Sequence, residues 1–273
     1  MATFQEFKSG IAILGSWPDS GLPGGGPVVQ EVDRHGPFNL AIIDPPYGEI
    51  LKHKKWDRAE SEEKFVKLMF GWLATLQPHI APNGAIYWWG GIGKPKFRPF
   101  YQFAGRVEHE SEFLIANHIT WKKRRAYGVK HNYLFTREEV LWLIRGDNIK
   151  TPLIFNIPLL EKERGYAGYD KRYPAKSKFL RRTNVWDDVT EIFRGKLSDA
   201  QKPVKLYEII INTHTNPGDT VLDTFAGSGT TAIAAMRTGR RFVVVDEDPK
   251  EFAKTVKRIR EEEDVQKRVD AKV

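Results

Sequence analysis

The sequence predicts an α/β protein with a mostly parallel, doubly wound β-sheet. Two stretches lead to this prediction, because each runs from a strand through a helix into a second strand, which is the unit of a parallel sheet. The first spans residues 38–90 and the second spans residues 220–246. With 273 residues, of which 41% are hydrophobic, the chain can bury the core of one large domain.

The first half of the chain alternates short apolar runs with amphipathic stretches. Apolar runs rich in β-branched and aromatic residues predict the strands, which are residues 11–15, 38–43, 85–89, 117–121 and 139–144. A helix is expected to open at Ser61, because apolar residues recur after it at the spacing of one buried face: Phe65, Leu68, Met69, Trp72, Leu73 and Leu76. Residues 20–27 predict a flexible loop, and a second helix is expected within residues 97–116.

The last third of the chain holds the second unit of the sheet. Pro203 suits the first turn of a helix that buries Tyr207 and His214 on one face. A strand at 220–225 then leads into a Gly-x-Gly turn, a helix and a second strand at 241–246 that ends in an acid. A charged helix is expected from Pro249 onward.

Residues 147–200 differ in character from the segments on either side. They hold many prolines, glycines and tyrosines with little periodicity, and their basic residues are interleaved with aromatic ones. Basic groups neutralise phosphates and aromatic rings stack on bases, so this segment is a candidate for nucleic-acid binding, although it could also be a solvated surface loop. The chain is therefore divided into residues 1–146, the inserted region 147–200 and residues 201–273.

Composition narrows the class of protein further. A formal net charge of +8 and a pI near 9.4 favour an anionic partner such as nucleic acid. The absence of cysteine excludes disulfides, thiolate metal sites and a cysteine nucleophile. The histidines show no paired metal-ligand spacing, so no metal is expected. No signal peptide and no apolar stretch of the roughly 20 residues that cross a bilayer is present, which predicts a cytoplasmic protein with no membrane contact.

The stretch Asp44-Pro45-Pro46-Tyr47 ends the strand at 38–43. Two prolines fix the backbone, and Pro45 keeps Asp44 out of helical conformations, so the four residues form a stiff corner. A flat substrate with an NH2 group could stack on Tyr47 and donate to the Asp44 carboxylate and to the Pro45 carbonyl. The alternative is a proline-rich strand end with a helix-capping acid.

The second motif is the turn between the strand at 220–225 and the following helix. Its glycines, Gly227 and Gly229, let the backbone approach a ligand, and the helix N-terminus offers N–H groups. Asp246, at the tip of the next strand, is placed to accept from ribose hydroxyls. The third glycine of the dinucleotide fingerprint is absent, which disfavours an NAD site. In a doubly wound sheet, both motifs would lie at the carboxyl ends of strands, where ligands bind.

Together, Asp44-Pro45-Pro46-Tyr47 and Asp223-Thr224-Phe225-Ala226-Gly227-Ser228-Gly229-Thr230 resemble the catalytic and cofactor motifs of amino-specific DNA methyltransferases. Their order, with the catalytic motif first, is similar to the permuted beta group. The resemblance covers most of the chain outside residues 16–37 and 147–182. Two departures affect minor cofactor contacts: Ser16 stands where the group has an acid, and Ser198-Asp199-Ala200 replaces a histidine and a proline.

The resemblance implies a Rossmann-like methyltransferase fold with a small inserted target-recognition region, and S-adenosylmethionine as the methyl donor. The donor would be held by Asp223, Phe225, Ala226, Gly227, Ser228, Gly229 and Thr230, with Asp246 at its ribose and Lys202 closing the pocket. Asp44, Pro45, Pro46 and Tyr47 would clamp a flipped base. The loop at 48–61 would cover that base.

DNA contacts are expected from two basic segments, the loop at 122–130 and the inserted region. Their residues are Lys122, Lys123, Arg124, Arg125, Lys171, Arg172, Lys178 and Arg181. Double-stranded DNA is the expected partner. A homodimer and a cognate restriction endonuclease are further partners that the resemblance implies.

The predicted reaction is methylation of a base amine by a site-specific DNA methyltransferase. Methylation at C5 of cytosine needs a cysteine, which leaves N6 of adenine and N4 of cytosine. An Asp at the first motif position goes mostly with adenine in this family, which favours N6. Three alternatives stay open: an N4-cytosine enzyme, an RNA target, and a catalytically silent, methyltransferase-like subunit that binds nucleic acid.

Overall fold

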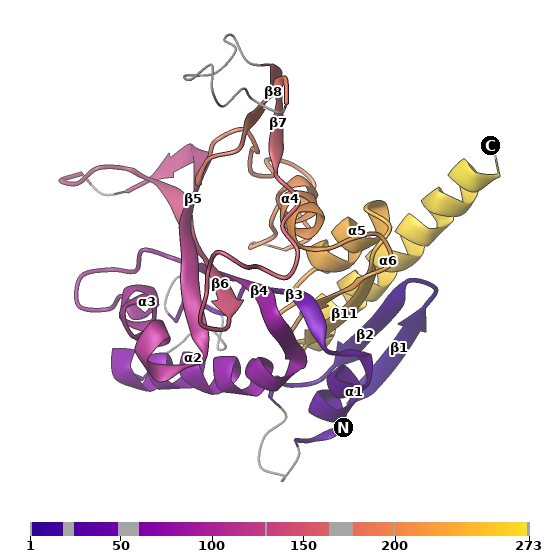
Figure 1. The fold of residues 1–273 in the computed structure, drawn as a ribbon, viewed down its shortest axis with the longest axis horizontal. Helices are drawn as coiled ribbons and strands as arrows, with labels where there is room; N and C mark the ends of the chain where they lie inside the picture. Colours follow the sequence, from indigo (N-terminus) through magenta and orange to yellow (C-terminus); the bar gives the residue numbers. More distant parts are fainter. Residues whose placement is uncertain are drawn as a thin grey trace.

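The computed structural model describes residues 2–18, 25–48, 60–128, 130–163, 177–198 and 200–271. Within them, nine strands form one twisted sheet in the order β1-β2-β11-β10-β3-β4-β6-β5-β9 (Figure 1). These strands are β1 Thr3–Phe7, β2 Gly10–Leu14, β3 Phe38–Ile43, β4 Ile80–Gly90, β5 Phe113–Tyr127, β6 Phe135–Arg145, β9 Val185–Trp186, β10 Thr220–Asp223 and β11 Arg241–Asp246.

The five central strands run parallel, from β2 through β11, β10 and β3 to β4. Within this sheet, β1 pairs antiparallel with β2 at one end, and β6 pairs antiparallel with both β4 and β5 at the other, where the short β9 runs parallel to β5. The predicted mostly parallel sheet is thus confirmed.

Helices cover both faces of the sheet, as expected for a doubly wound fold (Figure 1). One face packs against α1 Pro27–His35, α2 Glu62–Leu76 and α3 Pro99–Glu110. The other packs against α4 Val204–His214, α5 Thr230–Arg237 and α6 Pro249–Asp270.

The strands are buried on both faces, so their sequences read as continuous apolar runs. In β4, Ile86 and Trp88 point into the core under α2 and α3, whereas Tyr87 and Trp89 point into the core under α4 and α5. Trp88 is fully buried and its ring stacks on Phe103 of α3 at a centroid distance of 4.7 Å. This two-sided packing fixes the sheet on which the motifs are carried.

Several elements differ from the sequence-based expectation. Strand β1 and helix α1 were not predicted, because β1 has only five residues with an exposed face and α1 starts at Pro27, the last residue of the stretch at 20–27 that was expected to be a loop. Leu68 was expected on the buried face of α2 and is 47% exposed instead. β4 starts at Ile80 rather than at 85, with Asn83 in a positive-φ conformation inside it.

The described parts of the region 147–200, residues 147–163, 177–198 and 200, contain little regular structure, as its composition indicates. Its main element is a separate two-stranded sheet, β7 Leu159–Glu163 and β8 Phe179–Arg181, which projects from the body of the molecule (Figure 1). Lys171 and Arg172 lie outside the described residues, as does most of the loop at 48–61.

The pairing of β3 with β10 has the greatest consequence for the site. Leu40 lies beside Val221 and Ala41 beside Leu222, in parallel register. The two motifs that follow these strands, far apart in the sequence, therefore leave the same edge of the sheet side by side.

Candidate active site

A cleft of about 1190 Å³ opens at the carboxyl ends of the parallel strands. Its wall contains Asp44, Pro45, Pro46 and Tyr47 after β3, and residues 223–228 with Thr230 after β10. Asp246 and Lys202 line it as well. The structure therefore brings both predicted halves of the site into one cavity.

Asp44 is the centre of a network of charged groups. Its Oδ2 accepts a hydrogen bond from Lys202 Nζ at 2.6 Å, and its Oδ1 accepts one from the Tyr47 hydroxyl at 2.9 Å. Lys202 is 5% exposed and its ammonium lies 4.9 Å from the ring centre of Trp89 and 5.6 Å from that of Tyr47. Both aromatic faces favour the cation and exclude water from it.

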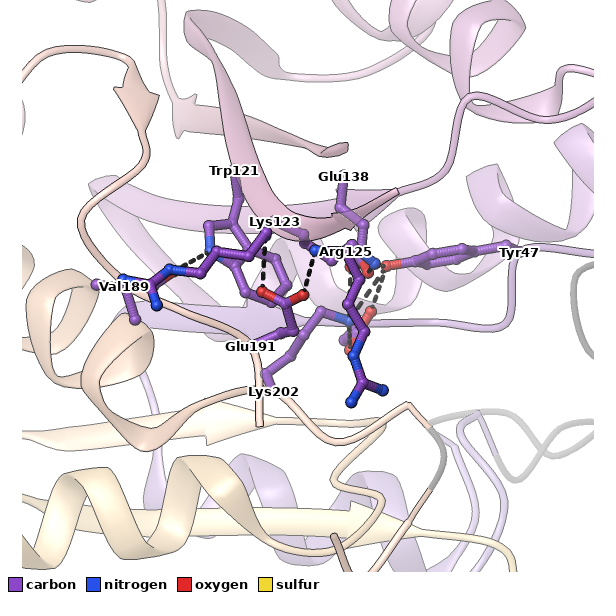
Figure 2. A network of polar contacts seen from close by, with 10 residues as sticks. Tyr47, Trp121, Lys123, Arg125, Glu138, Val189, Glu191 and Lys202 are labelled. Carbon is purple, nitrogen blue, oxygen red and sulfur yellow. Dashed lines mark hydrogen bonds and ion pairs between the residues drawn. The ribbon is translucent and has the colours of Figure 1, made fainter. Parts of the chain in front are cut away.

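Glu138, in β6, is a member of this network that the sequence did not single out. Its Oε2 lies 3.1 Å from Lys202 Nζ and 3.3 Å from the Tyr47 hydroxyl, and its Oε1 pairs with Lys123 (Figure 2). The sequence signal was a pair of adjacent acids, Glu138 and Glu139, directly before the apolar residues 140–144 of the same strand. Two carboxylates and two ammonium groups thus balance in charge.

The pKa values follow from burial and from these pairs. Burial raises the pKa of Asp44, and although Lys202 opposes it, the pKa stays above its usual value. Burial also acts to raise the pKa of Glu138, but the two lysines outweigh it and hold that pKa at about 2. Burial acts to lower the pKa of Lys202, yet Asp44 and Glu138 raise it, so the lysine stays charged.

The wall beside this network is held by a second acid, Glu191. It accepts hydrogen bonds from the backbone N–H groups of Arg124 at 2.9 Å and Arg125 at 2.7 Å (Figure 2). Next to it, the Trp121 indole N–H donates to the Val189 carbonyl at 2.8 Å. These bonds tie the inserted region to β5, so the strand that carries Lys123 is fixed over the cleft.

The glycine turn has the backbone that its sequence predicts. Gly227 and Gly229 have φ values of +52° and +76°, in the left-handed region that favours glycine. A Cβ at Gly229 would come within 2.8 Å of Thr255 in α6, so this glycine allows close packing. A Cβ at Gly227 would meet nothing within 4 Å, so that backbone borders open space in the cleft.

The Asp223 carboxylate holds this turn in place through hydrogen bonds. Its carboxylate accepts from the Phe225 N–H at 2.9 Å and from the Thr231 hydroxyl. Asp246 joins the turn to the next loop, since it accepts from the N–H groups of Gly227 at 2.6 Å and Asp248 at 2.8 Å. Burial raises the pKa of each acid to about 7, because their partners are neutral donors.

Two further residues near Asp246 were not predicted. Ser16, which stands where the resembling group has an acid, donates to Glu247 at 3.2 Å, and both line the cleft. Glu247 was missed because Asp246 occupied the expected position at the strand tip. This pair restores an acid to that part of the wall.

The basic residues predicted to contact DNA lie in different surroundings. Lys122, Arg124 and Arg125 are exposed on β5, whereas Lys123 points into the cleft toward Glu138. In the inserted region, Lys178 pairs with Glu163 at 2.9 Å, and Arg181 lies 5.5 Å from the Phe155 ring centre. Their role as DNA contacts stays a prediction.

No group of acids and histidines suited to a metal ion occurs among the described residues. Within the same residues, no helix is long and apolar enough to cross a membrane.

Removing Glu138 is expected to cost stability, because Lys123 loses its partner and Lys202 keeps only one. Glu138→Ala should lower the free energy of unfolding by roughly 2 to 3 kcal/mol. Glu163→Ala is the matched control, since it removes an exposed acid paired with Lys178 and should cost less than about 1 kcal/mol. Urea unfolding measures both, and equal losses would show that Glu138 is not held as a buried partner.

Asp223 should make stability depend on pH. Its pKa is 3.8 without the fold and about 7 within it, so between these values the native protein holds a proton that the unfolded chain has lost. The bound proton contributes to the free energy of unfolding. This contribution is present at low pH and is lost as the pH rises through about 7. The Asp223→Asn variant has no carboxyl at this position and lacks this contribution. Its free energy of unfolding, relative to that of wild type, should therefore rise between about pH 5 and pH 8. Denaturant unfolding across this range tests it, and a constant difference would mean that Asp223 is ionised throughout.

Comparisons with known proteins agree with this geometry. The family of N6 and N4 methyltransferases described as DNA methylase matches residues 38–258. The Type II methyltransferase M2.DpnII of Streptococcus pneumoniae is 28% identical over 246 residues, which cover 81% of each chain. The Type II methyltransferase M1.MboII of Moraxella bovis is 28% identical over 225 residues, which cover 76% of this chain and 83% of that protein.

Solved structures show the same fold. The M1.HpyAVI–SAM complex superposes with a TM-score of 0.57 at 25% identity, covering 85% of this chain and 94% of that one. The cytosine-N4-specific PvuII DNA methyltransferase gives a TM-score of 0.65 at 16% identity, covering 91% and 86%. The Rossmann-like fold is thus confirmed. Because the matched segment holds both the Asp44 corner and the glycine turn, the chain belongs to the DNA methylase family of N6 and N4 methyltransferases, which use S-adenosylmethionine as methyl donor.

Proposed function

We propose that this DNA methyltransferase transfers a methyl group to N6 of an adenine that has been turned out of double-stranded DNA. The proposal rests on one observation: the two motifs that follow β3 and β10 leave the sheet next to each other. This places the Asp44 carboxylate and the glycine turn in the wall of one cleft. A base on one side and a methyl donor on the other would then be held for direct transfer.

The residues of the glycine turn fit S-adenosylmethionine. Gly227 borders open space, α5 begins at Thr230 after Gly229 without a side-chain cap, and the buried Asp223 and the partly buried Asp246 have neutral partners. Acids in this state suit a cationic ligand, because a positive charge would favour their ionised forms. The turn from Phe225 to Thr230 would hold the methionine end, and Asp246 with Glu247 would face the ribose. The cofactor supplies a methyl group activated by a sulfonium.

Asp44 and Tyr47 would act on the base amine. The amine is a poor nucleophile because its lone pair is delocalised into the ring. As the bond from its nitrogen to the methyl group forms and the methyl–sulfur bond breaks, the nitrogen gains positive charge, which the Asp44 carboxylate stabilises by accepting an N–H hydrogen bond, with the Pro45 carbonyl as the second acceptor. The methylated nitrogen would then lose one proton to solvent, which leaves the neutral methylamine and a neutral thioether. Tyr47 would stack on the base. Glu138 would then take a larger share of the Lys202 ammonium, leaving Asp44 free to accept from the amine.

The choice of adenine rests on the acid itself. Asp44 opens the catalytic motif, and in this family an Asp at that position goes mostly with adenine. Cytosine presents a similar amine beside a ring nitrogen, so N4-methylcytosine is the second outcome of the test below. The base must leave the duplex in either case, because its amine is otherwise paired inside the stack.

DNA would be held by the exposed basic residues on β5 and in the inserted region 147–200. Lys122, Arg124, Arg125, Lys178 and Arg181 would neutralise phosphates, and other residues of the inserted region would read base edges. A homodimer and a cognate restriction endonuclease are further parts of the proposal. They rest on the family and on the Type II relatives.

The product of the reaction tests the proposal. The protein is incubated with isotopically labelled S-adenosylmethionine and unmethylated DNA, and the digested nucleosides are identified by mass. N6-methyladenine is the expected product. Asp44→Asn should slow transfer by roughly 100-fold or more, because the variant loses the charge that stabilises the methylated amine.

The matched control is Glu261→Gln, which removes one exposed carboxylate on α6 that pairs with Lys257 outside the cleft and should leave the rate unchanged. Asp44→Asn should still bind the cofactor, as measured by calorimetry. N4-methylcytosine would overturn the assignment of the base. Cofactor binding without any transfer to DNA would favour an RNA target or a silent subunit.

A further inference from the structure

We propose that Tyr133 and Leu134, at the tip of the β5–β6 hairpin, enter the DNA base stack where the target base has left it. This inference rests on the proposed function, since it concerns the duplex from which the base is taken. It gives a role to residues that neither the two motifs nor the basic clusters include.

The hairpin leads directly from the catalytic cleft to this tip. Strands β5 and β6 pair from Phe113 and Arg145 outward to Tyr127 and Phe135, and the pair extends beyond the edge of the sheet (Figure 1). Phe135, Arg137 and Glu138 of β6 line the cleft. Tyr133 is two residues beyond Phe135, which is at most about 7 Å of chain. The tip is therefore next to the opening through which a base would enter.

The tip exposes apolar side chains in sequence. Tyr133 is 92% exposed, Leu134 61% and Phe135 43%. Single exposed apolar residues are common, but three in succession on a projecting hairpin indicate a contact surface. The chain is thus apolar from the tip to Phe135, where β6 begins and lines the cleft.

The tip is also thin. Gly128 lies opposite Leu134, where a Cβ would come within 2.9 Å of Leu134 Cδ2 and 3.2 Å of its Cα. The two strands can approach this closely because Gly128 has no side chain. Proteins that open a base step insert apolar side chains such as leucine between neighbouring bases, and a thin edge suits such a gap.

The charges around the tip favour DNA over a protein partner. Lys122, Arg124 and Lys130 are exposed along the hairpin. The two acidic side chains of β6 already pair with basic side chains of the same hairpin: Glu138 pairs with Lys123, and Glu139 pairs with Arg137. An apolar edge between exposed cations matches a base stack between two phosphate backbones.

The expected energetic role is to lower the cost of base flipping. Unstacking and unpairing a base costs a few kcal/mol, and the cost is least for a mismatched base. Side chains that fill the vacated space offset part of this cost. Their removal should therefore impair methylation of a paired base much more than methylation of a mismatched one, whereas an ordinary DNA contact would matter equally for both.

The test uses the double variant Tyr133→Ala/Leu134→Ala of the full chain. Its substrates are two oligonucleotide duplexes carrying a target site mapped by sequencing the methylated DNA, one fully paired and one mismatched at the target base. The control is Val265→Ala/Val269→Ala, which removes two exposed apolar side chains from α6. Single-turnover rates and cofactor affinity are measured for all three proteins.

The tip variant should lose about tenfold or more in rate on the paired duplex and less than about threefold on the mismatched one. Its cofactor affinity and the rates of the control should stay at wild-type values. Equal losses on both duplexes, or no loss on either, would overturn the inference. If the tip variant changes from dimer to monomer and loses rate equally on both duplexes, the tip is instead a contact between two copies of the chain. Wild-type protein without transfer to any DNA would instead contradict the proposed function.

Discussion

The site depends on keeping a carboxylate charged where water is scarce. Asp44 is largely buried at the end of β3, with 16% of its side chain exposed, and burial alone would drive it toward its neutral form. Lys202 supplies the counter-charge at 2.6 Å, and Glu138 pairs with both Lys202 and Lys123, so two acids balance two lysines. The cluster draws on β3, β6 and the segment before α4, so the position of each element affects the pKa of Asp44: Lys202 acts to lower it and Glu138 acts to raise it.

The sheet explains how such distant segments meet. The parallel pairing of β3 with β10 and of β3 with β4 sends the Asp44 corner and the glycine turn out of the same edge. The antiparallel β6 then enters beside β4 and carries Glu138 toward that edge. Both faces of the sheet are covered by helices, which leaves this edge as the place where a cofactor and a base can approach together.

The local parts of the site were predictable from sequence because they depend on local rules. Asp44-Pro45-Pro46-Tyr47 restricts its own backbone, and Gly227 and Gly229 are needed where φ is positive. Glu138 and Glu247 were missed because their roles come from neighbours in space: Lys202 and Lys123 for one, Ser16 for the other. Helix α1 was missed for a different reason, as its capping residue is Gly26 and its sequence context is typical of a loop.

The pH dependence of single-turnover methyl transfer by Lys202→Met, at saturating cofactor and DNA, tests the central claim most directly. Transfer needs ionised Asp44, so the rate should fall as the pH drops through the pKa of that carboxyl. Because Lys202 acts to lower this pKa, its removal should move the acid limb of the profile to higher pH. An acid limb that stays at its wild-type position, with only a lower plateau, would contradict the account.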